Sequence, residues 1–385
     1  MRVAQIVQSL GVGGAEKLAV EIAGGLAAQG YDSHLIVLTP GGLLEETIPD
    51  SVCCHHLDLD YGSGGGTLPM VASLGRTYRR LVAITNDLRL EAVQTHLPMS
   101  NFFGLALAWS RSCRVFPTVH NNRECDYGDV GNPLRAGMRR LAYRQLLSYG
   151  TRMIAVSAAT KRAMVDELGI AGPWADRKLV VVPNGVTIPE SLSTEQVRAI
   201  RKQYDVPDSS VLLVGVGRLT EQKNFGDLIS ALTRLPDDAN RWFCLIAGEG
   251  EQHDVLERLV RESGLADRVR LVGHASAVDR LLGAADVFCL PSLWEGLPLA
   301  LLEALAAGIP VVANSISGVT DVVHHRRQSL LTESGDVDGL SKALLTLIQD
   351  SALRSSLGAE GRRLVECRYS FAEVTSRLAG IYGTS

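Results

Sequence analysis

The segment Pro291-Ser-Leu-Trp-Glu-Gly-Leu-Pro-Leu-Ala-Leu-Leu-Glu-Ala-Leu-Ala-Ala-Gly-Ile-Pro-Val-Val-Ala313 decides the fold of this chain. An apolar strand run at 287–290 precedes it and stops at Pro291. Pro298 suits the first turn of a helix because its φ is fixed near the helical value, and Gly308 is a typical C-terminal stop. The segment therefore predicts a strand, a loop, a helix near 298–307 and a second strand at 310–313.

Two carboxylates accompany the start of this helix. Glu295 lies in the loop before it, Glu303 lies on its second turn, and Gly296 lets another molecule approach the backbone. Free amides at a helix N-terminus bind anions. Such amides beside carboxylates suit a ligand with both phosphates and hydroxyls, such as a nucleotide sugar. The alternative is an ordinary βαβ unit with Glu303 near a helix dipole.

The same residues resemble the Glu-x7-Glu signature of the retaining glycosyltransferases of family 4 (glycosyl transferases group 1), which have the GT-B architecture. The resemblance includes the Glu-Gly-x-Pro start and the Glu-Ala-x-Ala-x-Gly-x-Pro continuation. It implies that Glu295 bonds the hydroxyls of the donor sugar and that Glu303 bonds the ribose. It also implies that Gly296 binds the donor and that the amides of Leu297 and Leu299 face the diphosphate.

A glycosidase with two catalytic carboxylates is disfavoured by the spacing. If all eight steps were helical, at about 1.5 Å each, Glu295 and Glu303 would lie roughly 12 Å apart. Hydrolase pairs lie within about 5–9.5 Å.

Length and composition indicate a globular protein with two domains. The chain has 385 residues, of which 46% are hydrophobic and 21% charged, and its net charge of -4 argues against nucleic acid as a partner. Seven cysteines without a C-x-x-C pair suit a reducing compartment, and Cys244 and Cys289 are expected in the core. The N-terminal strand pattern is not a signal peptide, and the apolar region 297–313 is too interrupted to span a membrane, so a cytoplasmic protein is expected.

Apolar strand runs alternate with helical patterns along the chain, which predicts parallel sheets covered on both faces. The expected fold class is α/β with two Rossmann-like, doubly wound parallel-sheet domains, and the GT-B resemblance implies that they face an interdomain cleft. The expected strands are 3–8, 35–38, 92–96, 115–120, 153–156, 179–182, 211–215, 243–247, 269–272, 287–290 and 311–313.

The domain boundary is expected after Pro183-Asn-Gly-Val-Thr-Ile-Pro189, where two prolines and an Asn-Gly turn close a strand. The N-terminal domain, 1–190, would bind the acceptor, and the C-terminal domain, 191–368, would bind the nucleotide sugar. Tyr369-Ser-Phe371 is similar to the point where the last helix of the family, here 369–385, crosses back to the N-terminal domain.

A glycine-rich loop, Gly11-Val-Gly-Gly-Ala-Glu-Lys17, follows the first strand. A dinucleotide fingerprint would need a glycine at position 16, where Glu16 stands. The loop looks like the family loop in which Gly13 and Gly14 touch the phosphates and sugar of the donor. A plain strand–helix turn is the alternative.

Two cations follow the first strand of the second half. Arg218 and Lys223 lie five residues apart on one loop, so both could reach a departing diphosphate, and the family carries Gly-Arg-x5-Lys there with that role. No metal is expected to be essential, because these cations would do a metal's work; Asp58-Leu-Asp60 has the letters of a metal motif in a segment without other site features.

Three polar residues end neighbouring strands of the first half. The Thr-x-His context of His120 resembles the histidine with which the family contacts its donor. Asn121 is expected on the acceptor side, and His96 is expected either on the acceptor side or as a structural residue. In the second half, Gly273 follows a strand, and the resemblance implies that its loop holds the nucleotide base; a plain turn is the alternative.

The segment 134–161 carries six cations and no acid, with apolar residues at roughly helical spacing. Such a helix can lie on anionic lipid, and many relatives dock on membranes; a solvated helix face is the alternative. The cations expected at the membrane are Arg135, Arg139, Arg140 and Arg144.

The predicted function is transfer of a sugar, with retention, from a nucleotide diphosphate sugar to a hydroxyl acceptor. UDP is favoured over GDP, and the acceptor is expected to be a glycan or lipid-linked saccharide of cell-surface polysaccharide synthesis, bound by loops that include 61–67 and 121–133. A nucleotide-sugar epimerase and a noncatalytic nucleotide-sugar binding protein remain as alternatives.

Overall fold

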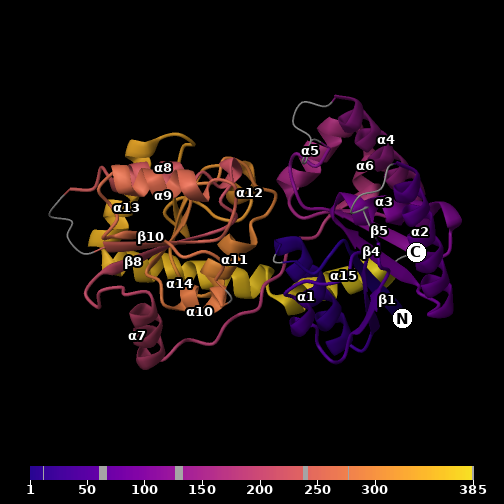
Figure 1. Ribbon diagram of the computed structural model, residues 1–385, viewed down its shortest axis with the longest axis horizontal. Coiled ribbons are helices and arrows are strands. Elements are labelled where there is room, and N and C mark those ends of the chain that lie inside the picture. The colour runs from indigo at the N-terminus through magenta and orange to yellow at the C-terminus, as the bar shows by residue number, and fades with distance from the viewer. Residues whose placement is uncertain (12, 60–66, 126–132, 237–241, 276, 384–385) are drawn as a thin grey trace. The chain divides into compact units, whose positions relative to one another are not determined.

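The computed structural model describes residues 1–11, 13–59, 67–125, 133–236, 242–275 and 277–383. The chain divides into two compact units, Met1–Gly185 with Phe371–Ser385, and Val186–Ser370 (Figure 1). The expected boundaries lay at 190 and 368. Each unit is described by itself. The loops 61–67 and 121–133, expected to shape an acceptor pocket, lie largely outside the described residues.

The first unit contains a seven-stranded parallel sheet with strand order β3-β2-β1-β4-β5-β6-β7. Five of the six residues of β1 and of β2 are buried, as expected for strands covered on both faces. The strands are β1 (Arg2–Val7), β2 (Asp32–Val37), β3 (Cys53–His56), β4 (Ala92–His96), β5 (Arg114–Val119), β6 (Met153–Ala155) and β7 (Leu179–Val181).

Helices connect these strands, and the last helix of the chain packs on α1 of the same unit. Tyr382 of this last helix is fully buried, and its ring lies 5.0 Å from that of Phe116 in β5. The helices are α1 (Gly14–Ala28), η1 (Glu45–Thr47), α2 (Thr67–Asp87), α3 (Leu97–Ser110), α4 (Pro133–Tyr149), α5 (Ala158–Leu168), α6 (Pro173–Lys178) and α15 (Phe371–Gly383).

The second unit contains a six-stranded parallel sheet with strand order β10-β9-β8-β11-β12-β13. Its strands are β8 (Val211–Val216), β9 (Trp242–Ala247), β10 (Val269–Leu271), β11 (Val287–Leu290), β12 (Val311–Asn314) and β13 (Ser329–Thr332). Its helices are α7 (Thr194–Gln203), η2 (Glu221–Lys223), α8 (Phe225–Leu232), α9 (His253–Glu262), α10 (Val278–Gly283), α11 (Leu299–Ala306), α12 (Ser317–Thr320), α13 (Val337–Gln349) and α14 (Ser351–Arg368). Both doubly wound sheets were predicted.

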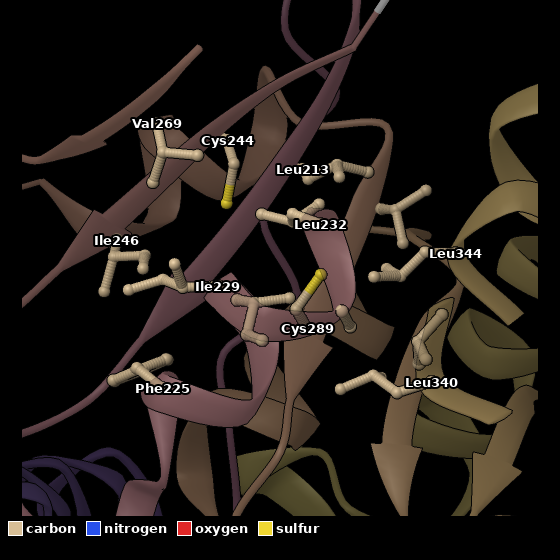
Figure 2. Close-up of a cluster of buried hydrophobic side chains, with 14 of the residues drawn as sticks. Leu213, Phe225, Ile229, Leu232, Cys244, Ile246, Val269, Cys289, Leu340 and Leu344 are labelled. Carbon is tan, nitrogen blue, oxygen red and sulfur yellow. The ribbon is translucent and has the colours of Figure 1, made fainter. Parts of the chain in front are cut away.

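A core cluster of the second unit is formed by its sheet and by helices that include α8, α9 and α13. Phe225, Ile229 and Leu232 of α8 pack among side chains of the strands (Figure 2). Cys244 and Cys289, both fully buried, belong to this cluster and confirm the prediction that they are core residues. Burial of this apolar surface holds α8, and with it the loop before α8, against the sheet.

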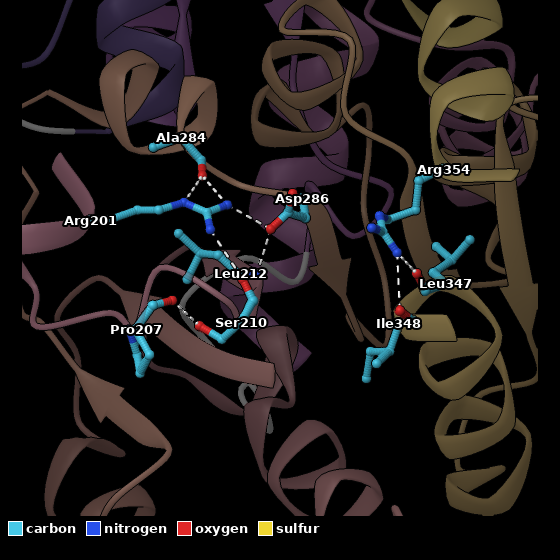
Figure 3. Close-up of polar contacts among 9 residues, drawn as sticks. All are labelled: Arg201, Pro207, Ser210, Leu212, Ala284, Asp286, Leu347, Ile348 and Arg354. Atoms are coloured by element: carbon cyan, nitrogen blue, oxygen red, sulfur yellow. Dashed lines mark hydrogen bonds and ion pairs between the residues drawn. The ribbon is translucent and has the colours of Figure 1, made fainter. Parts of the chain in front are cut away.

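Polar contacts attach α7 and α14 to the rest of the second unit (Figure 3). Arg201 of α7 lies 2.6 Å from the carboxylate of Asp286 and donates to the carbonyls of Ala284 and Ser210. The same carboxylate oxygen of Asp286 accepts from the amide of Leu212 at 2.7 Å, which places the pair at the start of β8. Arg354 donates to carbonyls at the C-terminus of α13, which helix termini otherwise leave unsatisfied.

Candidate active site

The predicted donor-binding residues of the second unit lie in loops at the point where the strand order of its sheet reverses. β8 and β11 are neighbours, and the chain continues to one edge of the sheet from β8 and to the other edge from β11. Ligands bind at such a switch point, outside the carboxyl ends of the strands. The loop after β8 carries Arg218 and Lys223, and the loop after β11 carries Glu295.

Lys223 and Glu295 form a largely buried ion pair across this point. The ammonium nitrogen lies 2.5 Å from Oε1 of Glu295, and the two side chains are 15% and 7% exposed. Gln222 donates to the other carboxylate oxygen at 3.4 Å. Arg218 is exposed on the same loop as Lys223. The sequence predicted both cations for a diphosphate; the structure brings Lys223 into contact with the carboxylate predicted for the sugar.

Three residues that were not predicted from the sequence hold the loop after β11, which carries Glu295. The side chain of Gln222 donates to the carbonyl of Trp294 at 2.9 Å, and Asn314, at the end of β12, donates to the carbonyl of Pro291 at 2.7 Å. Gly318 in α12 lies so close that an added Cβ would be 2.4 Å from the backbone oxygen of Glu295. The signal available in the sequence was Asn314 at a strand end, and the other two contacts depend on tertiary structure.

Gly318→Ala is therefore expected to displace the backbone at Glu295 and to lower the sugar transfer predicted from the sequence at least tenfold, because a misplacement of about 1 Å can cost that much. The measurement is kcat/KM with the thermal midpoint recorded in parallel. Gly226→Ala is the matched control, since an added Cβ there meets nothing within 4 Å. Equal activity of the two variants would contradict the tight approach at Gly318.

Helix α11 begins beside Glu295, as predicted. It spans Leu299–Ala306 with Pro298 as its N-cap, one residue shorter at each end than expected, and Gly308 ends it with φ +76°. Gly296 and Leu297 are buried in the loop before it, and Glu303 is half-buried on its second turn. The first-turn amides of a helix, including that of Leu299, have no partner within the helix, so this end is suited to an anion.

Backbone hydrogen bonds join the loops that follow β8, β9 and β10. Gly217 donates to the carbonyl of Ala247 at 3.0 Å, and Gly248 donates to that of Gly273 at 2.8 Å. Gly248 permits this approach, since an added Cβ would lie 1.9 Å from the carbonyl oxygen of Gly217. Gly273 has φ +66°, which favours glycine. The predicted base loop is thus joined by way of Gly248 to the loop that carries Lys223.

In the first unit, His96 and His120 lie together at the carboxyl edge of the sheet. His96 ends β4, His120 follows β5, and their ring nitrogens Nδ1 and Nε2 are 3.1 Å apart. Burial lowers the pKa of His120 to about 4. Burial also lowers the pKa of His96 well below its ordinary value, with His120 as a second cause. Both imidazoles are therefore neutral at pH 7.

The other predicted residues of the first unit have local contacts. The side chain of Asn121 accepts from the amide of Arg123 at 3.1 Å. Gly13 is the N-cap of α1 and Gly14 its first residue. An added Cβ at Gly13 would lie 2.2 Å from a carboxylate oxygen of Glu16, so glycine there accommodates that side chain.

Glu124, which the sequence analysis did not single out, is a buried acid after β5. It accepts a hydrogen bond from the hydroxyl of Tyr143 at 2.7 Å. Burial raises the pKa of Glu124 to about 7, against a lowering by the Tyr143 bond and a further rise from Glu167. No motif marks this residue, because its acidity depends on packing.

The raised pKa of Glu124 predicts a pH-dependent stability. Between pH 4.5 and 7 the unfolded chain releases this proton while the folded chain retains it, so this residue's contribution to stability falls as pH rises and levels off above pH 7. Glu124→Gln removes that loss. Its stability relative to the parent should rise from pH 5 to pH 8 by up to roughly 3 kcal/mol. Denaturant unfolding at the two pH values measures this, and a constant difference would contradict it.

Helix α4 contains the predicted basic segment up to Tyr149. Leu134, Met138 and Leu141 are exposed on it, whereas Leu146 is buried. Arg144, which the sequence grouped with membrane-facing cations, donates from two nitrogens to the carbonyl of Leu168 at the end of α5. That contact gives Arg144 a structural role. Among the described residues, no helix has the length and apolarity to cross a bilayer.

Comparison with known proteins gives matches over both units. The model of Glycosyltransferase Family 4 matches residues 12–188, and that of Glycosyl transferases group 1 matches residues 196–364. The lipopolysaccharide core biosynthesis glycosyltransferase LpsE of Rhizobium meliloti is 30% identical over 46% of this chain and half of that protein. UDP-Gal:alpha-D-GlcNAc-diphosphoundecaprenol alpha-1,3-galactosyltransferase of Escherichia coli is 27% identical over 84% of this chain and 81% of that protein.

Solved structures show the same fold. HepE of Anabaena, determined in complex with UDP-glucose, superposes with a TM-score of 0.81 over the whole of both chains at 20% sequence identity. The two family models together cover most of both sheets. The chain belongs to the family 4 (group 1) glycosyltransferases, and its fold is GT-B.

Proposed function

We propose that this protein is a retaining glycosyltransferase that uses a nucleotide diphosphate sugar. The observation that carries the proposal is the buried pair of Lys223 and Glu295 beside the N-terminus of α11, in a chain of this family. A cation and helix amides suit the diphosphate, while the carboxylates of Glu295 and Glu303 suit hydroxyls. The second unit would bind the donor and the first unit the acceptor.

In the proposed reaction, the bond between the anomeric carbon and the diphosphate oxygen breaks, and its electron pair remains on the diphosphate. Lys223, Arg218 and the amides near Leu297 and Leu299 stabilise this growing charge. The acceptor oxygen bonds to the anomeric carbon on the face that the diphosphate leaves. Its proton passes to the departing phosphate, so neither an enzymic nucleophile nor a metal is required.

UDP is the proposed nucleotide, and a glycan or lipid-linked saccharide the proposed acceptor. HepE, of the same fold, was determined with UDP-glucose, and the Escherichia coli relative is named for a UDP-galactose donor and a diphosphoundecaprenol acceptor. The base loop around Gly273 would contact the nucleotide through backbone atoms. His120 would bond the donor sugar, and His96 and Asn121 would lie toward the acceptor.

Incubation of the protein with UDP-glucose, UDP-galactose and GDP-mannose, each with and without undecaprenyl-diphosphate saccharide, tests the proposal. The expected product is an acceptor extended by one α-linked sugar, formed equally well with and without EDTA. Inverted linkage would exclude retention, and loss of activity in EDTA would exclude the metal-free mechanism. Interconversion of the donor sugar without acceptor would identify an epimerase.

We further propose that α4 rests on the anionic inner face of the membrane. Its exposed Leu134, Met138 and Leu141 alternate with Arg135 and Arg139, a combination that favours interfacial binding. Flotation with liposomes that contain anionic lipid should recover the protein at low salt, and Met138→Glu with Leu141→Glu should reduce recovery. Absence of binding at low salt would leave only a solvated helix face.

A further inference from the structure

A chain of hydrogen bonds connects His120 to the C-terminal helix of the first unit. Nε2 of His120 lies 3.1 Å from Nδ1 of His96, and Nε2 of His96 lies 2.9 Å from Oε1 of Gln5. The amide nitrogen of Gln5 donates to the hydroxyl of Tyr382 in α15 at 3.3 Å. The hydroxyl of Tyr382 donates in turn to Oε1 of Gln94.

The direction of these bonds determines where each imidazole carries its hydrogen. Oε1 of Gln5 can only accept, so Nε2 of His96 must carry a hydrogen. A neutral imidazole carries one hydrogen, so Nδ1 of His96 is an acceptor, and Nε2 of His120 must donate to it. Nδ1 of His120 is then left with a lone pair.

The hydrogen bonds at the Gln94 end of this network oppose a reversal of their donor–acceptor direction. The amide nitrogen of Gln94 donates to the hydroxyl of Thr118 at 2.7 Å, while its carbonyl oxygen accepts from Tyr382, so both ends of this amide group are bonded. Tyr382 has one hydrogen, so turning over Gln5 alone would leave one of two buried carbonyls without a donor. Reversing the direction of the network would require the side-chain amide groups of Gln5 and Gln94 to flip together. Burial opposes this, because both side chains are at most 2% exposed.

We propose that His96, Gln5 and Tyr382 are positioning residues that hold His120 with its hydrogen on Nε2. The partly exposed His120 then presents Nδ1 as an acceptor for a substrate hydroxyl. The identity of that hydroxyl as one on a sugar rests on the proposed function, whereas the tautomer itself does not. Removing the hydroxyl of Tyr382 in α15 should therefore change which ring nitrogen of His120, at the end of β5, carries the hydrogen.

The tautomer is measured directly in the full chain labelled with [15N]histidine. A long-range 1H–15N spectrum distinguishes protonated from bare ring nitrogens, and spectra of His96→Asn and His120→Asn identify the two residues. Hydrogen on Nε2 and a bare Nδ1 are expected for both. Tyr382→Phe should convert His120 to a mixture of tautomers. Hydrogen on Nδ1 of His120, or an unchanged spectrum in Tyr382→Phe, would overturn the proposal.

A double-mutant cycle separates positioning from general stability. Tyr382→Phe should lower kcat/KM for UDP-glucose or UDP-galactose about 5- to 20-fold in the parent, and have no further effect in a His120→Asn background. Tyr78→Phe is the matched control, because its hydroxyl donates to the backbone carbonyl of Ala106 rather than to a side chain of this hydrogen-bond network. Equal losses in both backgrounds would indicate loosened packing of α15 and refute the proposal. A parent without transfer activity would refute the proposed function, while the spectra would still decide the tautomer.

Discussion

Lys223→Met is expected to lower kcat about 100- to 1,000-fold, the effect typical of removing one preorganised group that stabilises developing charge. Methionine keeps the length and apolar stem of the side chain, which lies against Gly217. The ammonium group is lost, and with it both the proposed contact to the diphosphate and the partner of Glu295. Donor turnover under saturating acceptor measures the effect.

Two further variants make this prediction specific. Lys223→Arg keeps the charge and should retain more activity than Lys223→Met. Arg234→Met removes another cation of the same unit, paired with Asp338 at 2.5 Å on the surface, and should leave kcat unchanged. Lys223→Met also leaves the carboxylate of Glu295 buried without its cation, so its thermal midpoint should fall, and Glu295→Gln in the same chain should restore the midpoint without restoring turnover. Parent-like turnover of Lys223→Met would end its assignment to the site.

Most ends of the predicted strands lie within one to three residues of the observed ends. The strands were predictable because buried parallel strands leave continuous apolar runs in the sequence. Two strands were missed, Cys53–His56 and Ser329–Thr332. Both are edge strands, β3 of the first sheet and β13 of the second. An edge strand pairs on one side only and tolerates polar residues, so neither Cys-Cys-His-His nor Ser-Leu-Leu-Thr forms an apolar run.

The site was predictable only as separate motifs. The contact between Lys223 and Glu295 joins positions 72 residues apart, and it depends on β8 and β11 being neighbours. The roles of Gln222 and Gly318 depend on the distance between backbones, which no local pattern records. Arg144 is an example of a residue whose contact was not predicted. The charge pattern of the sequence placed it at a membrane, whereas in the structure it donates to the carbonyl of Leu168 at the end of α5.

Asp286→Ala should lower the free energy of unfolding of the second unit by roughly 3 kcal/mol, near the lower end of the range for breaking a buried pair because Asp286 is 30% exposed. The variant leaves Arg201, which is 12% exposed, without its carboxylate, and the amide of Leu212 without its acceptor. Hydrogen exchange of peptides from α7 and β8 measures the loss locally, where a single unfolding midpoint would mix the two units.

Asp205→Ala is the matched control for this change. Asp205 pairs with Arg270 at 2.9 Å in the same unit, but its side chain is 78% exposed, so its removal should cost less than about 1 kcal/mol. Arg201→Met combined with Asp286→Leu should recover part of the loss, because replacing both partners leaves no buried charge unpaired. Similar exchange in Asp286→Ala and Asp205→Ala would mean that water, rather than Arg201, satisfies Asp286. The attachment of α7 would then depend on apolar packing and on the bonds from Arg201 to the carbonyls of Ala284 and Ser210.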